Sequence, residues 1–276
     1  MAASLQNVQN DIAPRGAPMR SAWAVQRSVL FALILRELKT RFGGQWLGAL
    51  WTLGEPLVHV AAMLLILGYW RHRLLPGVDY VMFLVTGLVP FFMFRSLGLR
   101  LMAAVDSNMG LFAYRQVKPF DTLISRAVLE TSIYSFVYVA LLMGLGWYGF
   151  DVIPDRPLEL MGVSAIFLVI GFGLGTALAV LTDTAPQARA LVRLAFWPLY
   201  LVSCVILPVQ TLPPEIRQWL LWNPVLHALE LLRGYYFSGY RPLEETSLSY
   251  VVFTALVTLA LGLSLYRVRR HRLVAL

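Results

Sequence analysis

The chain has 276 residues, of which 58% are hydrophobic and only 14% are charged, with a formal net charge of +8. A soluble domain of this length needs more polar residues to cover its surface, so the composition excludes a soluble globular protein and favours a membrane domain. The positive charge does not require nucleic acid as a partner, because Lys and Arg gather in the cytosolic loops of membrane proteins. The one cysteine, Cys204, excludes an internal disulfide.

The N-terminal part predicts a disordered cytosolic tail followed by a surface helix. Residues 1–26 lack a continuous apolar stretch, which is not the pattern of a cleavable signal peptide. Over residues 27–42, apolar side chains share one helical face, and Arg36 and Lys39 lie opposite. This pattern is typical of an interfacial helix with its apolar face in lipid.

Six apolar runs are long enough to cross the bilayer. They cover residues 46–69, 80–101, 123–147, 158–181, 193–209 and 248–266, and the fifth is the shortest. With the N-terminus inside, sixteen Lys and Arg residues fall in cytosolic segments and six in outer ones. The sequence therefore predicts an all-α permease domain over residues 27–276, with both termini in the cytosol.

Residues 212–237 are apolar but broken, and they predict two short helices before the last span. Pro213 and Pro214 begin the first, and Asn223 caps the second, whose first position is Pro224. This broken hairpin fits a re-entrant segment and an external amphipathic hairpin equally well.

Ionisable side chains inside spans are the clearest functional signal. Glu55 and Arg95 favour a pairing or substrate role, and Arg100 and Arg126 near the cytosolic edge favour snorkelling. Glycines at 171, 173 and 175 favour close helix packing rather than phosphate binding, because no basic residue is near. No metal spacing among the four histidines and no P-loop motif is present, so we expect no catalytic residue, no metal and no ATP site in this chain.

Aromatic residues concentrate near the ends of predicted spans. The pattern includes Trp46, Trp51, Tyr69, Trp70, Trp197, Tyr200 and Trp222. An aromatic belt explains each ring taken singly, and a subset facing a shared interior forms a stacking surface for a glycan. Between the second and third spans, residues 106–121 predict a short cytosolic helix stopped by Pro119, with Leu111, Phe112 and Tyr114 exposed to a partner's groove.

Two motifs carry a family resemblance. Residues 36–42 (RELKTRF), residues 47–51 (LGALW) and Glu55-Pro56 resemble the opening signature of ABC exporter permeases for bacterial cell-surface polysaccharides. Residues 222–233 are similar to that family's N-P-x-x-x-x-x-E-x-x-R block, with Asn223, Pro224, His227, Glu230 and Arg233 in place. The likeness is strongest to the capsular polysaccharide exporters of Gram-negative bacteria. One departure is the missing arginine before Asp183, where the chain has Thr182.

The resemblance implies an inner-membrane homodimer that binds two copies of a separate ATPase, which uses ATP and Mg. A periplasmic co-polymerase and an outer-membrane export protein carry the lipid-linked glycan onward. The implied coupling element is the cytosolic helix around residues 111–117, including Arg115 and Val117. The interfacial helix, with Arg36, Lys39 and Arg41, admits the substrate, and the implied channel involves Trp46, Trp51, Glu55, His59, Tyr69, Trp70, Arg95 and Arg100.

Two alternatives stay open. An O-antigen or teichoic-acid exporter shares the same motifs, and an intramembrane enzyme acting on lipid-linked sugars would need a convergent set of acid, base or metal ligands.

Overall fold

The computed structural model describes residues 21–42, 54, 57–59, 61–63, 65–66 and 78–271. Within these ranges the chain is helical, with no strand. The longer helices are α2 (Ala22–Phe42), α4 (Tyr80–Met102), α5 (Pro119–Trp147), α6 (Pro157–Thr184), α7 (Ala188–Val202) and α10 (Leu248–Arg269). Shorter elements are η2 (Asp106–Leu111), η3 (Val209–Thr211), α8 (Pro214–Leu220) and α9 (Pro224–Tyr236).

Four helices, α4, α5, α6 and α10, are long and apolar enough to cross a membrane. The corresponding predicted spans differ from them by at most four residues at either end. The prediction worked here because an uninterrupted apolar run of this length has few alternatives to a spanning helix. The chain is a multi-pass membrane protein.

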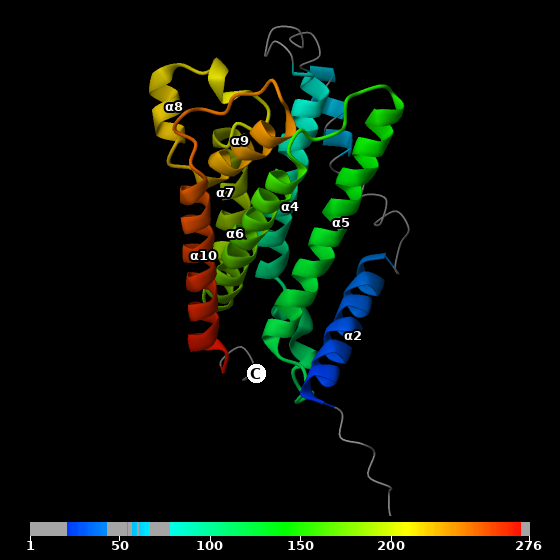
Figure 1. Ribbon diagram of the computed structural model, residues 1–276. Coiled ribbons are helices and arrows are strands. Elements are labelled where there is room, and N and C mark those ends of the chain that lie inside the picture. The colour runs from blue at the N-terminus through cyan, green and yellow to red at the C-terminus, as the bar shows by residue number, and fades with distance from the viewer. Residues whose placement is uncertain are drawn as a thin grey trace, which may run out of the picture.

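Helix α4 forms the centre of the bundle and packs against α5, α6, α7 and α9 (Figure 1). It is apolar over most of its length, and its buried side chains include Phe83, Leu88, Phe91 and Phe94. A helix with so few polar residues is stable only when other helices or lipid surround it.

Helices α6 and α10 pack closely because glycines line their contact. A Cβ placed on Gly173 would lie 2.5 Å from the backbone nitrogen of Leu259, and one on Gly262 would lie 2.5 Å from the carbonyl oxygen of Gly173. The predicted packing role of the glycines at 171, 173 and 175 is confirmed.

The fifth predicted span, residues 193–209, differs from the structure. Helix α7 begins earlier and ends at Val202, and its 15 residues reach only about 22 Å along the axis. The chain then turns at Cys204, a non-glycine residue with a φ of 50°. The first predicted span lies mostly outside the described residues, where only Gly54 and short pieces between residues 57 and 66 are described, as helix.

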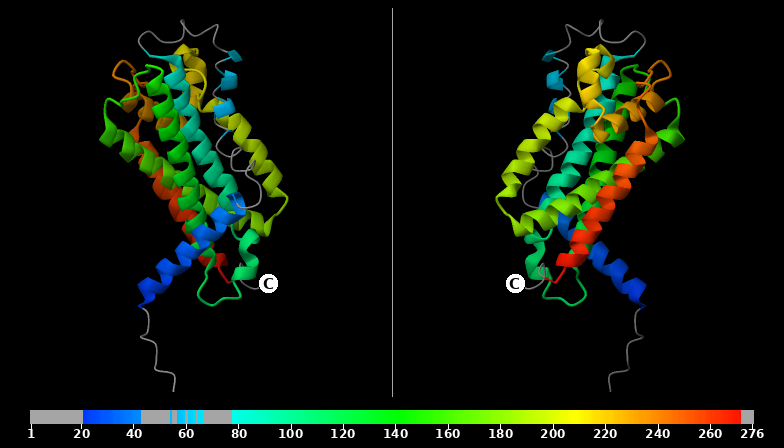
Figure 2. Two further views of the ribbon diagram at one scale, coloured as in Figure 1. Left: turned by 90° about the vertical axis from the view of Figure 1, so that its right-hand side faces the viewer. Right: turned by 90° about the vertical axis from the view of Figure 1, so that its left-hand side faces the viewer.

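Helix α2 begins at Ala22, five residues before the predicted interfacial helix, so the predicted disordered tail of residues 1–26 is wrong over residues 22–26. The side chain of Gln26 donates a hydrogen bond to Asp121 of α5 at 2.6 Å, which ties this first turn to the bundle. Phe31, Leu35 and Leu38 are exposed, as expected for a face turned to lipid. Figure 2 shows α2 projecting sideways from one end of the bundle.

That end of the bundle also holds η2, the start of α5 and the end of α10, whereas α8 and α9 lie at the opposite end (Figure 1). Pro213 and Pro214 begin α8 and Pro224 begins α9, as predicted. Helix α9 is largely buried against α4, α6 and α10, and α8 has no buried residue.

Candidate substrate path and coupling elements

An aromatic pocket lies between α4, α7 and the described part of the first span. The pocket has a volume of about 130 Å³ and is lined by His59, Phe91, Phe92, Arg95, Phe196, Trp197 and Tyr200. Phe92 and Arg95 share one face of α4, and Trp197 and Tyr200 share one face of α7, because residues three apart are neighbours on a helix.

Ring contacts order this pocket. The Nε2 atom of His59 lies 2.9 Å from the Tyr200 hydroxyl, and its ring meets Phe92 edge to face with centroids 5.1 Å apart. Phe92 and Tyr200 are stacked at 6.3 Å. Trp197 is 60% exposed at the rim. Flat apolar rings beside one guanidinium can stack on sugar rings and attract an anionic group.

Of the residues predicted to line the substrate path, the structure brings His59 and Arg95 together in this pocket. Arg36, Lys39 and Arg41 lie on α2, and Arg100 lies in the last turn of α4. Five others lie outside the described residues: Trp46, Trp51, Glu55, Tyr69 and Trp70.

A buried ion pair joins α2 to α5. The Arg41 Nη1 atom lies 2.5 Å from Glu130 Oε1, and the side chains are 10% and 2% exposed. The other carboxylate oxygen accepts a hydrogen bond from the Ser96 hydroxyl at 2.7 Å, and Arg100 Nε lies 3.7 Å from Oε1. This carboxylate therefore holds α2 against α4 and α5.

Arg126 does not snorkel, so that interpretation is wrong. Its side chain is 8% exposed and its Nη2 atom lies 2.7 Å from Glu37 of α2. It also donates hydrogen bonds to the carbonyl of Arg100 at 3.0 Å and to the Ser107 hydroxyl at 2.9 Å. The two terminal nitrogens of this buried guanidinium therefore find partners without reaching water.

The segment predicted to couple to an ATPase differs in structure from its prediction. The short helix is η2, Asp106–Leu111, and residues 112–117 are turns and loop. Pro119 is the first residue of α5 and does not stop a preceding helix, because a proline is favoured at the first helical position. Tyr114 and Arg115 are exposed, whereas Leu111, Phe112 and Val117 are half-buried.

At the opposite end, the motif of residues 222–233 builds a cap over the bundle. Asn223 accepts a hydrogen bond from the backbone of Val225 at 3.0 Å, confirming the predicted helix cap, and donates to Ser203 at 2.8 Å. His227 Nε2 lies 2.8 Å from the Leu221 carbonyl and therefore carries the proton, while Nδ1 accepts from the backbone of Ser247 at 3.1 Å. Trp222 is 81% exposed.

Arg233 is fully buried and fastens α9 to the turn after α7. It donates to the carbonyls of Cys204 and Val205 at 2.9 and 2.7 Å, and its guanidinium carbon lies 3.7 Å from the centre of the Phe83 ring. A side chain on Gly87 would collide with the guanidinium, which explains the glycine there. Arg233 therefore has a structural role.

Glu230 lies beside Arg233, with an oxygen 3.6 Å from Nη1. It accepts hydrogen bonds from Tyr240 at 2.6 Å and from Gln210 at 3.2 Å. Burial raises the pKa of Glu230, and Arg233 opposes that shift. Burial, with the nearby Glu230 charge, also raises the pKa of the Tyr240 phenol.

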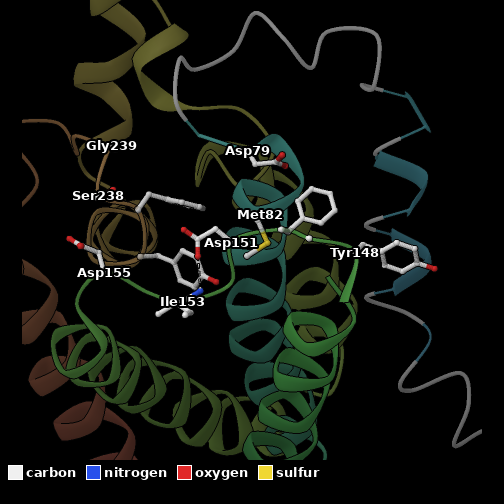
Figure 3. A pocket seen from close by; sticks show the side chains of 12 residues that line it. Asp79, Met82, Tyr148, Asp151, Ile153, Asp155, Ser238 and Gly239 are labelled. Carbon is white, nitrogen blue, oxygen red and sulfur yellow. Dashed lines mark hydrogen bonds between the residues drawn. The ribbon is translucent and has the colours of Figure 1, made fainter. Parts of the chain in front are cut away.

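A larger cavity, of about 420 Å³, opens beside this cap (Figure 3). Asp79, Asp151 and Asp155 line it and no Lys or Arg does. Asp151 accepts a hydrogen bond from the backbone of Ile153 at 3.2 Å, so it also shapes the loop. Because like charges repel, this cavity is unsuited to an acidic glycan, and the aromatic pocket is the better candidate.

Several residues of these sites were not predicted. Phe91, Phe92 and Phe196 looked like ordinary lipid-facing apolar residues, and Ser96 carried no charge to draw notice. One signal was available in the sequence. Phe92 lies three residues from Arg95 and Ser96 lies four residues from Arg100, so each shares a helical face with an arginine.

Comparison with known proteins identifies the family. Residues 28–237 match the model of the ABC-2 type transporter family. The chain is 40% identical over 255 residues to the polysialic acid transport protein KpsM of Escherichia coli, covering 92% of this chain and 98% of that protein. It is 28% identical over 249 residues to the capsule polysaccharide export inner-membrane protein CtrC of Neisseria meningitidis serogroup B, covering 88% and 91%.

A more distant relative is the O-antigen export system permease protein RfbA of Myxococcus xanthus, 23% identical over 250 residues, covering 89% of this chain and 94% of that protein. The family match spans more than half of the sequence, and the relatives align over nearly their whole length. The chain therefore belongs to the ABC-2 type transporter family.

Proposed function

We propose that this chain is the permease subunit of an ATP-driven exporter of capsular polysaccharide. The observation that carries the proposal is the 40% identity to a polysialic acid transport protein over almost the whole of both chains. A substrate that is a lipid-linked, acidic glycan agrees with the net charge of +8, although cytosolic loops also account for part of that charge.

The glycan path we propose runs from α2 toward the aromatic pocket. Helix α2 offers Arg36 and Lys39, both exposed, to anionic headgroups, and its apolar face to acyl chains. The exposed ring of Trp197 then stacks on sugars beside Arg95, and the buried Tyr200 forms the wall of the pocket behind it.

For the membrane topology we propose six spans in the inner membrane, with both termini cytosolic. The four apolar helices and the placement of α2 and the end of α10 at one end of the bundle support this (Figure 1). Helix α7 and the first predicted span supply the remaining two. For residues 212–237 we propose an external cap at the outer surface and not a re-entrant hairpin immersed in lipid. The polar contacts of α9 support this choice.

We further propose a homodimer that binds two ATPase subunits. ATP and Mg are used by the ATPase, with no cofactor bound by this chain, and Leu111, Phe112, Tyr114, Arg115 and Val117 form the docking surface for it. A periplasmic co-polymerase and an outer-membrane export protein are the partners that take over the glycan.

The test is complementation. This chain and its ATPase are expressed in an Escherichia coli strain lacking its polysialic acid transport protein, and surface polysialic acid is measured. Restored surface glycan that requires the ATPase supports the proposal. If no ATPase copurifies with the chain, or if the isolated chain turns over glycolipid, the proposal is contradicted and an intramembrane enzyme is favoured.

A second candidate is export of an O-antigen, which the likeness to RfbA supports more weakly at 23% identity. Export of a teichoic acid is a further alternative that rests on the shared sequence motifs. Vesicles reconstituted with the permease and ATPase distinguish capsule export from O-antigen export. Uptake of a capsule-type lipid-linked glycan in preference to an O-antigen-type one is the expected result.

A further inference from the structure

Three consecutive residues of η2 each bind a different part of the bundle. Asp106 pairs with Arg189 of α7, Ser107 bonds Arg126 of α5, and Asn108 bonds Arg36 of α2. The element has only six residues. One short cytosolic segment is therefore tied to the interfacial helix and to the helix that lines the aromatic pocket.

The bond to α2 is well defined. Arg36 Nη1 donates to the Asn108 side-chain oxygen at 2.6 Å, and the Asn108 amide nitrogen donates to the carbonyl of Ala104 at 2.8 Å. Asn108 is buried, so leaving its oxygen unpaired is unfavourable. The amide holds one orientation, and its acceptor points at α2.

The contact with α7 lies at the other end of that helix from the pocket. Arg189 and Asp106 form an ion pair between half-buried side chains, at the second residue of α7. Trp197 and Tyr200 follow two and three turns later on the same helix, with Trp197 before the internal Pro198. A tilt of the base of α7 therefore moves the pocket lining.

Ser107 gives η2 a fixed support. The Arg126 group that bonds Ser107 also bonds the last turn of α4 and Glu37 of α2. A segment held by discrete bonds on three sides shifts as a unit rather than deforming, which is the condition for mechanical coupling between sites.

We propose that η2 links α2 and α7, so that one displacement of η2 by the ATPase moves the substrate gate and the aromatic pocket together. Asp106, Asn108, Arg36 and Arg189 are positioning residues in this link. The inference rests on the proposed export function and adds the residues that transmit the stroke.

The test uses the full permease–ATPase complex in vesicles and measures glycan transported and ATP hydrolysed. Asp106→Asn, Arg189→Met and Asn108→Leu are expected to lower transport about fivefold, the size of one coupling interaction, while ATP hydrolysis stays within about twofold. Arg193→Met on α7 and Arg27→Met on α2 are matched controls. Both are exposed, with no hydrogen bond or ion pair in the part of the chain that the structure describes, and they should transport normally.

A charge exchange separates coupling from folding. The double variant Asp106→Arg with Arg189→Asp is expected to recover most of the transport that Asp106→Arg alone or Arg189→Asp alone removes. Transport per ATP equal to that of the unchanged complex in all three single variants would overturn the link. The link would also be overturned if the double variant recovered no transport although each single variant of the exchange folds and hydrolyses ATP. Failure of the unchanged complex to transport any glycan would instead contradict the export function.

Discussion

Arg41 of α2 and Glu130 of α5 form an ion pair between two helices, 89 residues apart in the sequence. The carboxylate side chain is only 2% exposed and also bonds Ser96. A buried pair contributes little net stability when intact, because desolvation offsets the attraction, but losing one partner leaves a buried charge unpaired. The pair thus fixes where α2 sits.

We expect Glu130→Ala to destabilise the permease by about 3 kcal/mol, because it leaves the guanidinium of Arg41 buried without its anion. The melting temperature of the purified protein in detergent measures this. Glu245→Ala, at an exposed position, is the control. The double variant Arg41→Met with Glu130→Leu should recover much of the loss, and equal melting temperatures for Glu130→Ala and Glu245→Ala would disprove the role of the pair.

Gly173→Ala should separate α6 from α10. The added methyl would lie 2.5 Å from the backbone of Leu259, and two backbones must move apart to admit it. Overpacking of this kind costs about 1 to 3 kcal/mol. Gly162→Ala, on the same helix but with open space around it, should raise stability by up to about 1 kcal/mol, because alanine favours a helix more than glycine does. Similar melting temperatures for the two variants would contradict the packing argument.

Trp197→Ala should lower export by up to about tenfold, because the rim of the pocket loses the most exposed of its large rings for stacking. Leu194→Ala, one turn earlier on α7 and 65% exposed, is the control. Transport at several glycan concentrations shows whether binding or turnover changes. An effect no larger than that of Leu194→Ala would remove Trp197 from the substrate path.

The local features of this fold follow from local patterns. The apolar runs predicted α4, α5, α6 and α10, and the prolines and Asn223 predicted where α8 and α9 begin. The early end of α7 did not follow, because it depends on Arg233, 29 residues away, binding the carbonyl of Cys204. A turn that distant side chains stabilise leaves no signal in its own residues.

The candidate sites follow the same rule. Sequence reasoning singled out Arg95 and His59, but not that they share a pocket, because His59 meets Tyr200 across 141 residues. Arg126 was misread because its position near a span end fits snorkelling, whereas its partner Glu37 lies on another helix. Both the shared pocket and the burial of Arg126 depend on contacts between helices that are distant in the sequence. Such contacts are set by how the helices pack.

Arg233→Lys should destabilise the cap nearly as much as Arg233→Met. A lysine keeps the charge but lacks the planar fork that binds the carbonyls of Cys204 and Val205 together. Both carbonyls then lie buried with weaker partners, at a cost of about 2 to 3 kcal/mol. Melting temperature and the yield of folded protein measure this, and a Lys variant as stable as the unchanged protein would show that charge alone suffices.

Labelling of single cysteines tests the membrane orientation. With Cys204→Ala as background, cysteines replace Arg115 and Ile153, both exposed and separated in the chain by the single spanning helix α5. An impermeant maleimide on spheroplasts should label position 153 and reach position 115 only after the membrane is opened. The reverse pattern would place η2 outside the cell, away from any ATPase. Labelling of both positions from outside would show that α5 does not cross the membrane, and the proposed coupling through η2 would fail with it.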